Sequence, residues 1–246
     1  MKSIAIISIL LAWAGPAAAA DLTIMVEDAS EPFSRADGSG YANDIVRAAF
    51  AASHIDVRLD VVPYARCKLS VLQGKTPACF AMSWSPEFAG KIAFSDQPLF
   101  HVYADIFRNG GTGGKLAGAA DFRKGAVLGV VNEYEYSASI NQLANRGVVF
   151  YRGIDELAIL NMLSRRRIDA AVIMTSDFVD GHKRLLAAGV SDTVAFGYRG
   201  GTLNSYIGFS LLNPKGQEAR REFNEGYKII LRNGTAAKIK NNWMHR

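Results

Sequence analysis

The chain has few of the residues that build metal centres or disulfide frameworks. It contains two cysteines and four histidines in 246 residues, and the histidines show no ligand spacing with the cysteines. It has no Gly-x-Ser-x-Gly nucleophile elbow. Beyond residue 20 it also has no apolar run of the about 20 residues needed to cross a bilayer. We therefore expect no metal site, no cofactor and no membrane-spanning segment.

What is present is the composition of an ordinary folded protein. Hydrophobic residues make up 49% of the chain and charged residues 21%, which excludes a disordered chain, a coiled coil or a collagen-like chain. A chain of this length can bury a substantial core in one or two domains. The formal net charge is +5.

The first twenty residues have the layout of a secretory signal. Lys2 gives a positive start, residues 4–14 are apolar except for Ser8, and Pro16 precedes a run of alanines. The apolar run is too short for a membrane anchor. Because no cysteine lies near residue 20, we do not expect a lipoprotein. We expect cleavage after Ala20 and a periplasmic protein, which argues against nucleic acid as a partner.

Two local motifs have structural explanations. Residues 109–116, NGGTGGKL, resemble a phosphate loop, but Asn109 replaces its first glycine and Leu116 its final Ser or Thr. We interpret this segment as a flexible turn. The three arginines at 165–167 follow a predicted helix, where they can pair with the last carbonyl groups of that helix.

The two cysteines are Cys67 and Cys79, separated by eleven residues. In an oxidising compartment two cysteines in a mature chain are expected to form a disulfide, which would contribute roughly 3 kcal/mol. Two buried free thiols remain the alternative.

Hydrophobic periodicity predicts alternating strands and helices. The first block contains strands at 22–26, 57–62 and 78–82 and helices at 44–52 and 64–72. The second contains strands at 102–107, 127–131, 148–151 and 170–173 and helices at 137–144 and 154–164. A strand at 205–211 and helices at 218–232 and 236–243 complete the chain. This order predicts parallel strands with helical crossovers, in two lobes of about a hundred residues each.

A series of short motifs accompanies these elements along nearly the whole of residues 21–246. They are Glu31-Pro32-Phe33, Gly40-Tyr41, Asp44-Ile45-Val46, Leu72-Gln73-Gly74-Lys75, Ser83, Ser85-Pro86-Glu87, Phe94-Ser95-Asp96, Gly125, Leu128-Gly129-Val130, Ile168-Asp169-Ala170, and 223–234 followed by Trp243. Their order and spacing resemble the bacterial extracellular solute-binding proteins of family 3. These are type II periplasmic binding proteins that deliver polar amino acids and related small solutes to ABC importers.

The resemblance implies an α/β fold of two lobes, each a mostly parallel sheet flanked by helices, joined by a two-strand hinge. The first lobe would comprise residues 21–100 and 202–246 and the second residues 101–201, with Val102 and Arg199 near the hinge crossings. The ligand would lie in the cleft between the lobes. The protein would be a monomer that contacts an ABC transporter permease transiently.

The resemblance also implies two charged contacts to an α-amino acid, and both are missing here. The Arg that grips the ligand's α-carboxylate is replaced by Phe88, and the Asp that holds its α-ammonium is replaced by Met174. Asp177 lies just beyond and could substitute for that Asp. A charge-assisted hydrogen bond contributes about 1.5–3 kcal/mol, so these losses disfavour a standard α-amino acid as ligand.

The remaining candidate ligand-binding residues are aromatic and polar. Tyr64 matches the family's stacking aromatic residue, Ser83 matches a serine of the binding turn, and Arg66 could bind an anion. The full set is Tyr64, Arg66, Ser83, Trp84, Phe88, Asn132, Glu133, Tyr134 and Thr175. Glu133 and Glu135 would favour a cation or a hydroxyl-bearing ligand.

Structural roles for several of these residues stay open. Trp84 and Phe88 can equally pack beneath the loop, and Arg66 can pair with a surface acid. One of Tyr134 and Tyr136 is expected to face solvent, because these tyrosines alternate with glutamates.

The favoured function is that of a solute receptor, with no catalytic residues, which binds a small polar ligand other than a standard amino acid. The first alternative is a periplasmic enzyme similar to cyclohexadienyl dehydratase, with Glu27, Glu133 or Glu135 as the acid. The second is an accessory binding protein of a periplasmic oxidoreductase.

Overall fold

The computed structural model describes residues 21–111 and 116–245. The predicted signal and much of the predicted glycine-rich turn lie outside the described residues. Within the described part, no helix combines the length and apolar character needed to cross a membrane.

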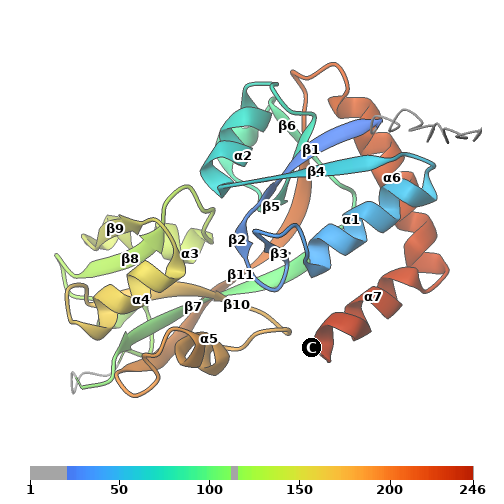
Figure 1. The fold of residues 1–246 in the computed structure, drawn as a ribbon. Helices are drawn as coiled ribbons and strands as arrows, with labels where there is room; N and C mark the ends of the chain where they lie inside the picture. The colour runs from blue at the N-terminus through green and yellow to red at the C-terminus, as the bar shows by residue number, and fades with distance from the viewer. Residues whose placement is uncertain (1–20, 112–115, 246) are drawn as a thin grey trace, which may run out of the picture.

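The chain is a mixed α/β protein whose elements gather in two bodies, which we call the first and second lobe (Figure 1). The longer sheet has the strand order β4-β1-β5-β11-β7-β10-β8-β9, with β6 paired to β11. The described sheet order therefore runs from one lobe into the other through β11 and β7.

The first lobe is formed by both ends of the described chain. Strand β1 pairs in parallel with β4 and with β5. Its strands are β1 (Leu22–Glu27), β4 (Val57–Val62), β5 (Ala78–Met82) and β6 (Ile92–Phe94), with a short hairpin of β2 (Ala29–Ser30) and β3 (Ser34–Arg35). Its helices are α1 (Tyr41–Ala52), α2 (Tyr64–Leu72), α6 (Gly216–Arg232) and α7 (Thr235–Met244), with a 3-10 turn at Pro86–Phe88.

The second lobe is formed by the middle of the chain. Strand β8 pairs in parallel with β9 and β10. Its elements are β8 (Val127–Val131), β9 (Val149–Gly153), β10 (Ala170–Thr175), α3 (Ala138–Asn141), α4 (Glu156–Ser164) and α5 (Gly181–Ala187), with 3-10 turns at Ala119–Asp121 and Ala144–Arg146.

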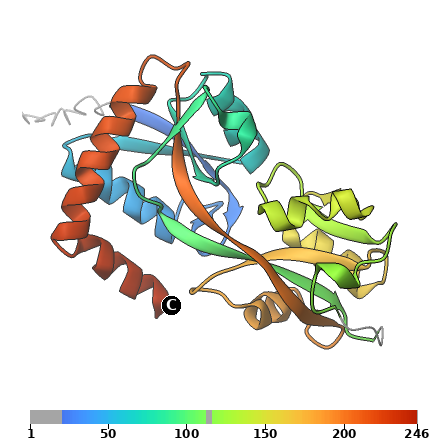
Figure 2. The ribbon, with the colours of Figure 1, turned by 180° about the vertical axis from the view of Figure 1, so that it is seen from behind.

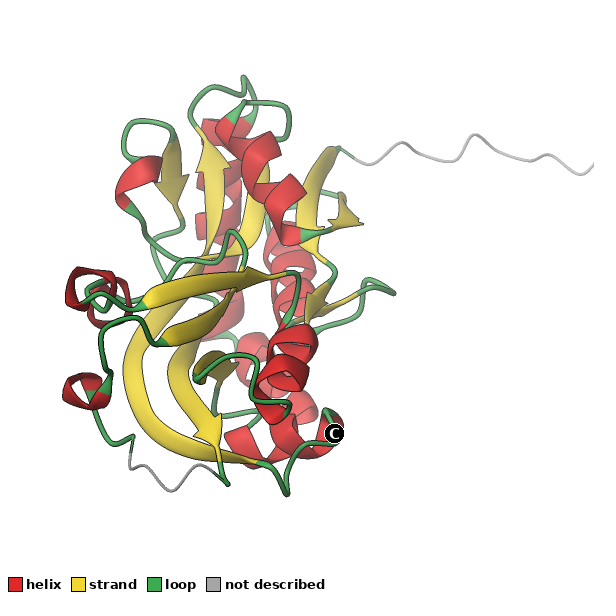
Figure 3. Ribbon diagram, turned by 90° about the vertical axis from the view of Figure 1, so that its left-hand side faces the viewer, coloured by secondary structure: helices red, strands yellow, loops and turns green. Residues whose placement is uncertain are grey.

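Two long strands connect the lobes. Strands β7 (Phe100–Asn109) and β11 (Val194–Ser210) are antiparallel and paired from Asn109–Val194 to Phe100–Ser205, with two register shifts. Figures 2 and 3 show them running side by side from one lobe to the other as long curved strands.

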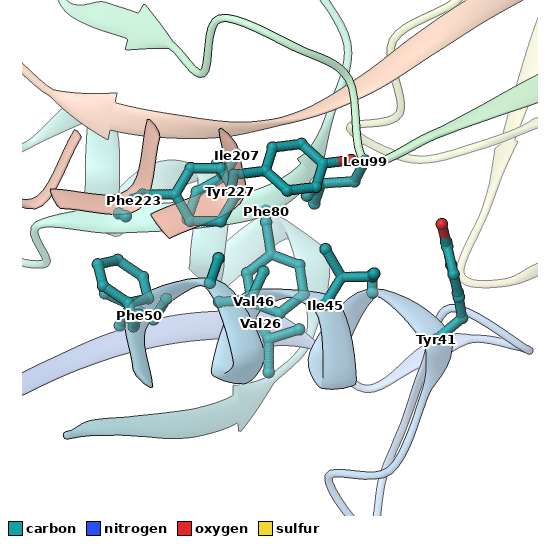
Figure 4. Packing of buried hydrophobic residues seen from close by; sticks show 14 of the residues in the cluster. Val26, Tyr41, Ile45, Val46, Phe50, Phe80, Leu99, Ile207, Phe223 and Tyr227 are labelled. Atoms are coloured by element: carbon teal, nitrogen blue, oxygen red, sulfur yellow. The ribbon is translucent and has the colours of Figure 1, made fainter. Parts of the chain in front are cut away.

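Buried aliphatic and aromatic side chains hold each lobe together. In the first lobe, Val26 of β1, Ile45 of α1 and Phe223 of α6 belong to one buried cluster (Figure 4). Each fully buried side chain of this kind contributes roughly 1.5–3 kcal/mol. A Cβ atom on Gly226 would lie 1.8 Å from the carbonyl oxygen of Ala49, so the close packing of α6 on α1 requires glycine there.

The structure confirms most of the predicted elements and corrects others. The strands predicted at 57–62, 78–82 and 127–131 and the helix predicted at 64–72 have the predicted bounds. The helix predicted at 137–144 is too long, because α3 ends at Asn141. Beyond it, the Leu143 amide donates to the Ile140 carbonyl, three residues earlier, in place of the four-residue step of an α-helix. The pattern does not reveal α5, because this helix buries only Leu185.

The predicted disulfide is present and joins two elements of the first lobe. Cys67 of α2 and Cys79 of β5 are bonded, with a Cα–Cα distance of 5.6 Å, and both residues are fully buried. The bridge fixes α2 to the central strands, so the residues that α2 presents to the second lobe have a firm support.

We expect the double variant Cys67→Ser/Cys79→Ser to have a free energy of unfolding lower by about 3 kcal/mol, because its unfolded chain is no longer cross-linked. Urea unfolding followed by circular dichroism measures this difference. Reductant should destabilise the wild type and leave the variant unchanged, since the chain has no other cysteine. Equal stabilities of the two proteins would contradict the expectation.

Candidate functional site

A small cavity lies between the two lobes and is lined from both of them. Its volume is about 50 Å³. The first lobe and the connecting strands supply Glu27, Ala29, Ser30, Phe33, Tyr64, Ala81, Ser83, Phe100, Val102 and Ser205, and the second supplies Tyr134, Glu135, Glu156, Met174 and Arg184.

The carboxylate of Glu135 reaches from the second lobe into the first. Its Oε2 accepts hydrogen bonds from the Tyr64 hydroxyl at 2.6 Å and the Ser83 amide at 3.2 Å. Its Oε1 lies 3.2 Å from Lys68 Nζ. The Glu135 side chain is only 4% exposed, so these are buried contacts that join the lobes.

Lys68 binds several acceptors of the same region. Its Nζ donates to the carbonyl oxygen of Glu133 at 3.0 Å and lies 2.9 Å from a carboxylate oxygen of Glu87. Burial lowers the pKa of Lys68, but Glu135 and Glu87 outweigh this effect and the pKa is raised overall. Lys68 is therefore a stable positive charge between the lobes.

A second polar contact joins the lobes at the end of β1. The Tyr134 hydroxyl donates to Glu27 Oε1, and the Tyr134 ring meets the Tyr64 ring edge-on at 5.4 Å between centroids. On the far wall, Glu156 accepts from the Met174 amide at 2.5 Å and lies 3.8 Å from Arg184 Nε. The carboxyl groups of Glu27 and Glu156, the Tyr134 hydroxyl and the Arg184 guanidinium come from four separate parts of the chain and all line this cavity.

The segment after β8 has a conformation that aims its side chains at the first lobe. Glu133 has a left-handed backbone with φ of 64°, which turns the chain. The Asn132 amide donates to the Gly153 carbonyl at 2.8 Å, and the Val131 amide donates to the Tyr136 hydroxyl at 2.8 Å. These bonds fix the turn, so the positions of Tyr134 and Glu135 are set by the second lobe.

The carboxyl groups of the cavity ionise less readily than exposed ones. Burial raises the pKa of Glu27 to about 8, against the opposing effect of the hydrogen bond from Tyr134. Burial also raises the pKa of Glu135, although Lys68 and Tyr64 lower it, and that of Glu156, although Arg184 lowers it. A positive charge entering the cavity would favour ionisation of all three.

The structure places three of the predicted ligand-binding residues on the cavity wall: Tyr64, Ser83 and Tyr134. Trp84, Asn132 and Glu133 instead line a wider groove outside the cavity, where Trp84 is 64% exposed. That groove also touches both lobes, so these side chains lie near the cleft without lining the cavity.

The other predicted residues lie elsewhere. Arg66 is exposed and outside the cavity lining. Phe88 is 1% exposed and packs in the core beside Cys67, with Lys68 Nζ 5.4 Å from its ring. Thr175 is buried at the end of β10, and its hydroxyl donates to Asp105 of the connecting strand β7 at 2.6 Å.

Asp177, which could substitute for the missing ligand carboxylate, is exposed and accepts a hydrogen bond from Tyr103 outside the cavity lining. A further expectation is wrong. Neither Tyr134 nor Tyr136 is exposed, because both hydroxyls make the hydrogen bonds described above.

Sequence reasoning missed Lys68, Glu156 and Arg184. Lys68 follows Tyr64 by four residues, a spacing that puts both on one face of α2, and this signal could have identified it. Glu156 starts α4 and Arg184 belongs to α5, which has no clear apolar periodicity. Within the described residues no group of His, Cys, Asp and Glu is arranged to hold a metal ion.

Comparison with known proteins identifies a family whose model matches nearly all of the described chain. The family model of bacterial extracellular solute-binding proteins, family 3, matches residues 22–246. A comparison with curated proteins finds no match.

Several solved structures share the fold. A histidine kinase sensor domain with similarity to periplasmic binding proteins has a TM-score of 0.73 at 19% identity, over 90% of this chain and 95% of its own. The arginine-, lysine- and histidine-binding protein ArtJ of Geobacillus stearothermophilus has a TM-score of 0.72 at 15% identity, over 92% and 95%. An ancestral amino-acid-binding protein, a precursor of cyclohexadienyl dehydratase, has a TM-score of 0.70 at 17% identity, over 91% and 95%.

The raised pKa of Glu27 predicts that stability falls as pH rises. Between about pH 5 and 8 the folded chain keeps a proton on Glu27 that the unfolded chain has released, so one such group lowers the free energy of unfolding by up to about 1.4 kcal/mol per pH unit. Glu135 and Glu156 act in the same direction. Urea unfolding at several pH values should show a shallower fall for Glu27→Gln.

The control is Glu218→Gln, which removes an exposed carboxylate on α6 and should keep the wild-type pH dependence. An identical pH dependence in Glu27→Gln and the wild type would contradict the assignment.

Proposed function

The chain belongs to the bacterial extracellular solute-binding proteins of family 3, and from this premise we propose that it is a periplasmic receptor which captures a small polar solute between its lobes for an ABC importer. The observation that supports this function best is the cavity lined by both lobes. A solute there contacts both lobes only when they are closed, so its binding favours closure.

The proposed movement is a change in angle between the lobes about β7 and β11. We propose that residues 21–100 with 202–246 move as one unit and residues 101–201 as the other. Apart from those strands, the lobes meet through side-chain contacts such as Tyr64 with Glu135 and Arg184 with the Glu31 carbonyl at 2.7 Å. Such contacts can break and reform without any loss of backbone pairing within a lobe.

We further propose that the solute is not a standard α-amino acid. Phe88, at the position of the expected carboxylate-binding Arg, is buried in the core. Met174, at the position of the expected ammonium-binding Asp, lines the cavity with a side chain that carries no charge. Asp177 does not supply the missing charge in the cavity, since it lies outside the cavity lining.

The cellular context follows from the same proposal. Residues 1–20 would be a secretory signal, and a disulfide between the two cysteines suits an oxidising compartment. The receptor would act as a monomer that meets a membrane permease transiently.

One observation favours a second candidate function, that of a periplasmic lyase. Glu27 is a buried carboxyl group with a pKa of about 8 on the cavity wall, and a general acid needs such a pKa near neutral pH. The fold is shared with an ancestral precursor of cyclohexadienyl dehydratase. The receptor is preferred because the family model that matches residues 22–246 is one of solute-binding proteins.

A screen of small solutes tests the receptor function. Residues 21–246 should show a thermal shift with at least one member of a panel of amino acids, amines, organic acids and sugars. The chain from Asp21 contains two tryptophans, Trp84 and Trp243, so in Trp243→Phe the fluorescence of Trp84 in the interlobe groove should report closure. No shift with any solute, together with turnover of a cyclohexadienyl substrate, would overturn the receptor proposal in favour of the lyase.

Tyr64→Ala should weaken solute binding at least tenfold, because it removes both a cavity wall and the hydroxyl that holds Glu135. Tyr64→Phe keeps the ring and should cause a smaller loss. Isothermal titration with a solute found in the screen measures both effects. Tyr151→Ala, at an exposed tyrosine of β9, is the control, and an equal effect of all three variants would contradict the role of Tyr64.

A further inference from the structure

The hydrogen-bond donors that the first lobe directs toward Glu135 are already used by the chain itself. The Tyr64 hydroxyl and the Ser83 amide both donate to Oε2 of Glu135, and Lys68 Nζ lies beside Oε1. These groups together form a site for one carboxylate. A solute carboxylate would find the site filled and a negative charge within it.

The cavity wall carries more acidic than basic side chains. Glu27, Glu135 and Glu156 line it, and Arg184 is the single Lys or Arg among the described residues that do so. Arg184 is engaged by the Glu31 carbonyl at 2.7 Å. Glu135 Oε1 is paired with Lys68 Nζ at 3.2 Å, and Lys68 is not among the residues that line the cavity.

Aromatic rings complete the wall. Phe33 and Phe100 are stacked at 3.6 Å between centroids and line the cavity with Tyr64 and Tyr134. Aromatic faces attract cations, most strongly where water is excluded. The volume of about 50 Å³ leaves space for only a few non-hydrogen atoms.

On the basis of the proposed receptor function, we propose that the solute is a small organic cation without a carboxylate, such as a short alkylamine. Its ammonium group would lie between Glu27, Glu135 and Glu156, and its alkyl part would contact the aromatic rings. Glu135 then has two roles, since it fills the carboxylate site of the first lobe and adds a carboxyl group to the cavity wall beside the cation.

This arrangement links binding to proton release. A cation beside Glu27 favours the ionised form of that group, so affinity should rise with pH between about 6 and 8, by up to about tenfold per unit. The titratable and charged groups that face Glu27 or share its cavity are Tyr64 of α2, Asp28 after β1, Tyr134 and Glu135 after β8, Glu156 of α4 and Arg184 of α5.

Isothermal titration of residues 21–246 with matched probes tests the proposal. Ethylamine and tetramethylammonium are the cations, propanol is the neutral analogue, propionate is the anion and alanine is the zwitterion. We expect at least one cation to bind at least tenfold more tightly than propanol, propionate or alanine. Glu27→Gln should weaken cation binding about 10- to 100-fold, because a charged partner of the cation is lost.

Variants distinguish a direct role from a loss of folding. Glu156→Gln is a second, independent removal of a cavity charge and should also weaken cation binding. Glu218→Gln removes a remote surface charge on α6 and should leave it unchanged. Cation affinity that is unchanged in both Glu27→Gln and Glu156→Gln would overturn the proposal.

The outcomes also separate this proposal from the receptor function. If propionate, propanol or alanine binds the wild type more tightly than either cation, the cation proposal fails and the receptor function stands. If no probe and no member of the wider solute panel binds, both fail.

Discussion

The contact between the two lobes centres on one buried carboxyl group, that of Glu135. It comes from the second lobe, yet its main partners are Tyr64, Ser83 and Lys68 of the first. Removing a buried carboxylate from such partners leaves donors unpaired, which costs more than the net gain of each bond. The turn after β8, the face of α2 and the disulfide beneath α2 all serve to hold these groups in contact.

The fold could largely be read from the sequence, because its lobes follow simple periodic patterns. The strands at 57–62 and 78–82 have the predicted bounds since their apolar residues alternate or run continuously into a core. The exposed half of β11 and the helix α5 could not be read in this way. Their residues bury little apolar surface, so pairing with β7 and packing on β10 decide their structure.

The site could be predicted only in part, because its geometry arises between lobes that are distant in sequence. Tyr64 and Ser83 were identifiable by resemblance, and both line the cavity. The partnership of Tyr64 with Glu135 spans 71 residues and that of Tyr134 with Glu27 spans 107, and no local pattern encodes either. Phe88 was predicted as a ligand-binding residue because it lies beside the binding turn, but its side chain is buried in the core.

The pairing of β7 with β11 bears on the proposed movement of the lobes. These strands stay hydrogen bonded across the junction between the lobes, with only two register shifts. If the lobes move as proposed, opening keeps this backbone pairing and must break the side-chain contacts at the cavity. Those of Glu135 with Tyr64, Ser83 and Lys68 and that of Tyr134 with Glu27 would all have to break, so their combined strength would set the rate of opening.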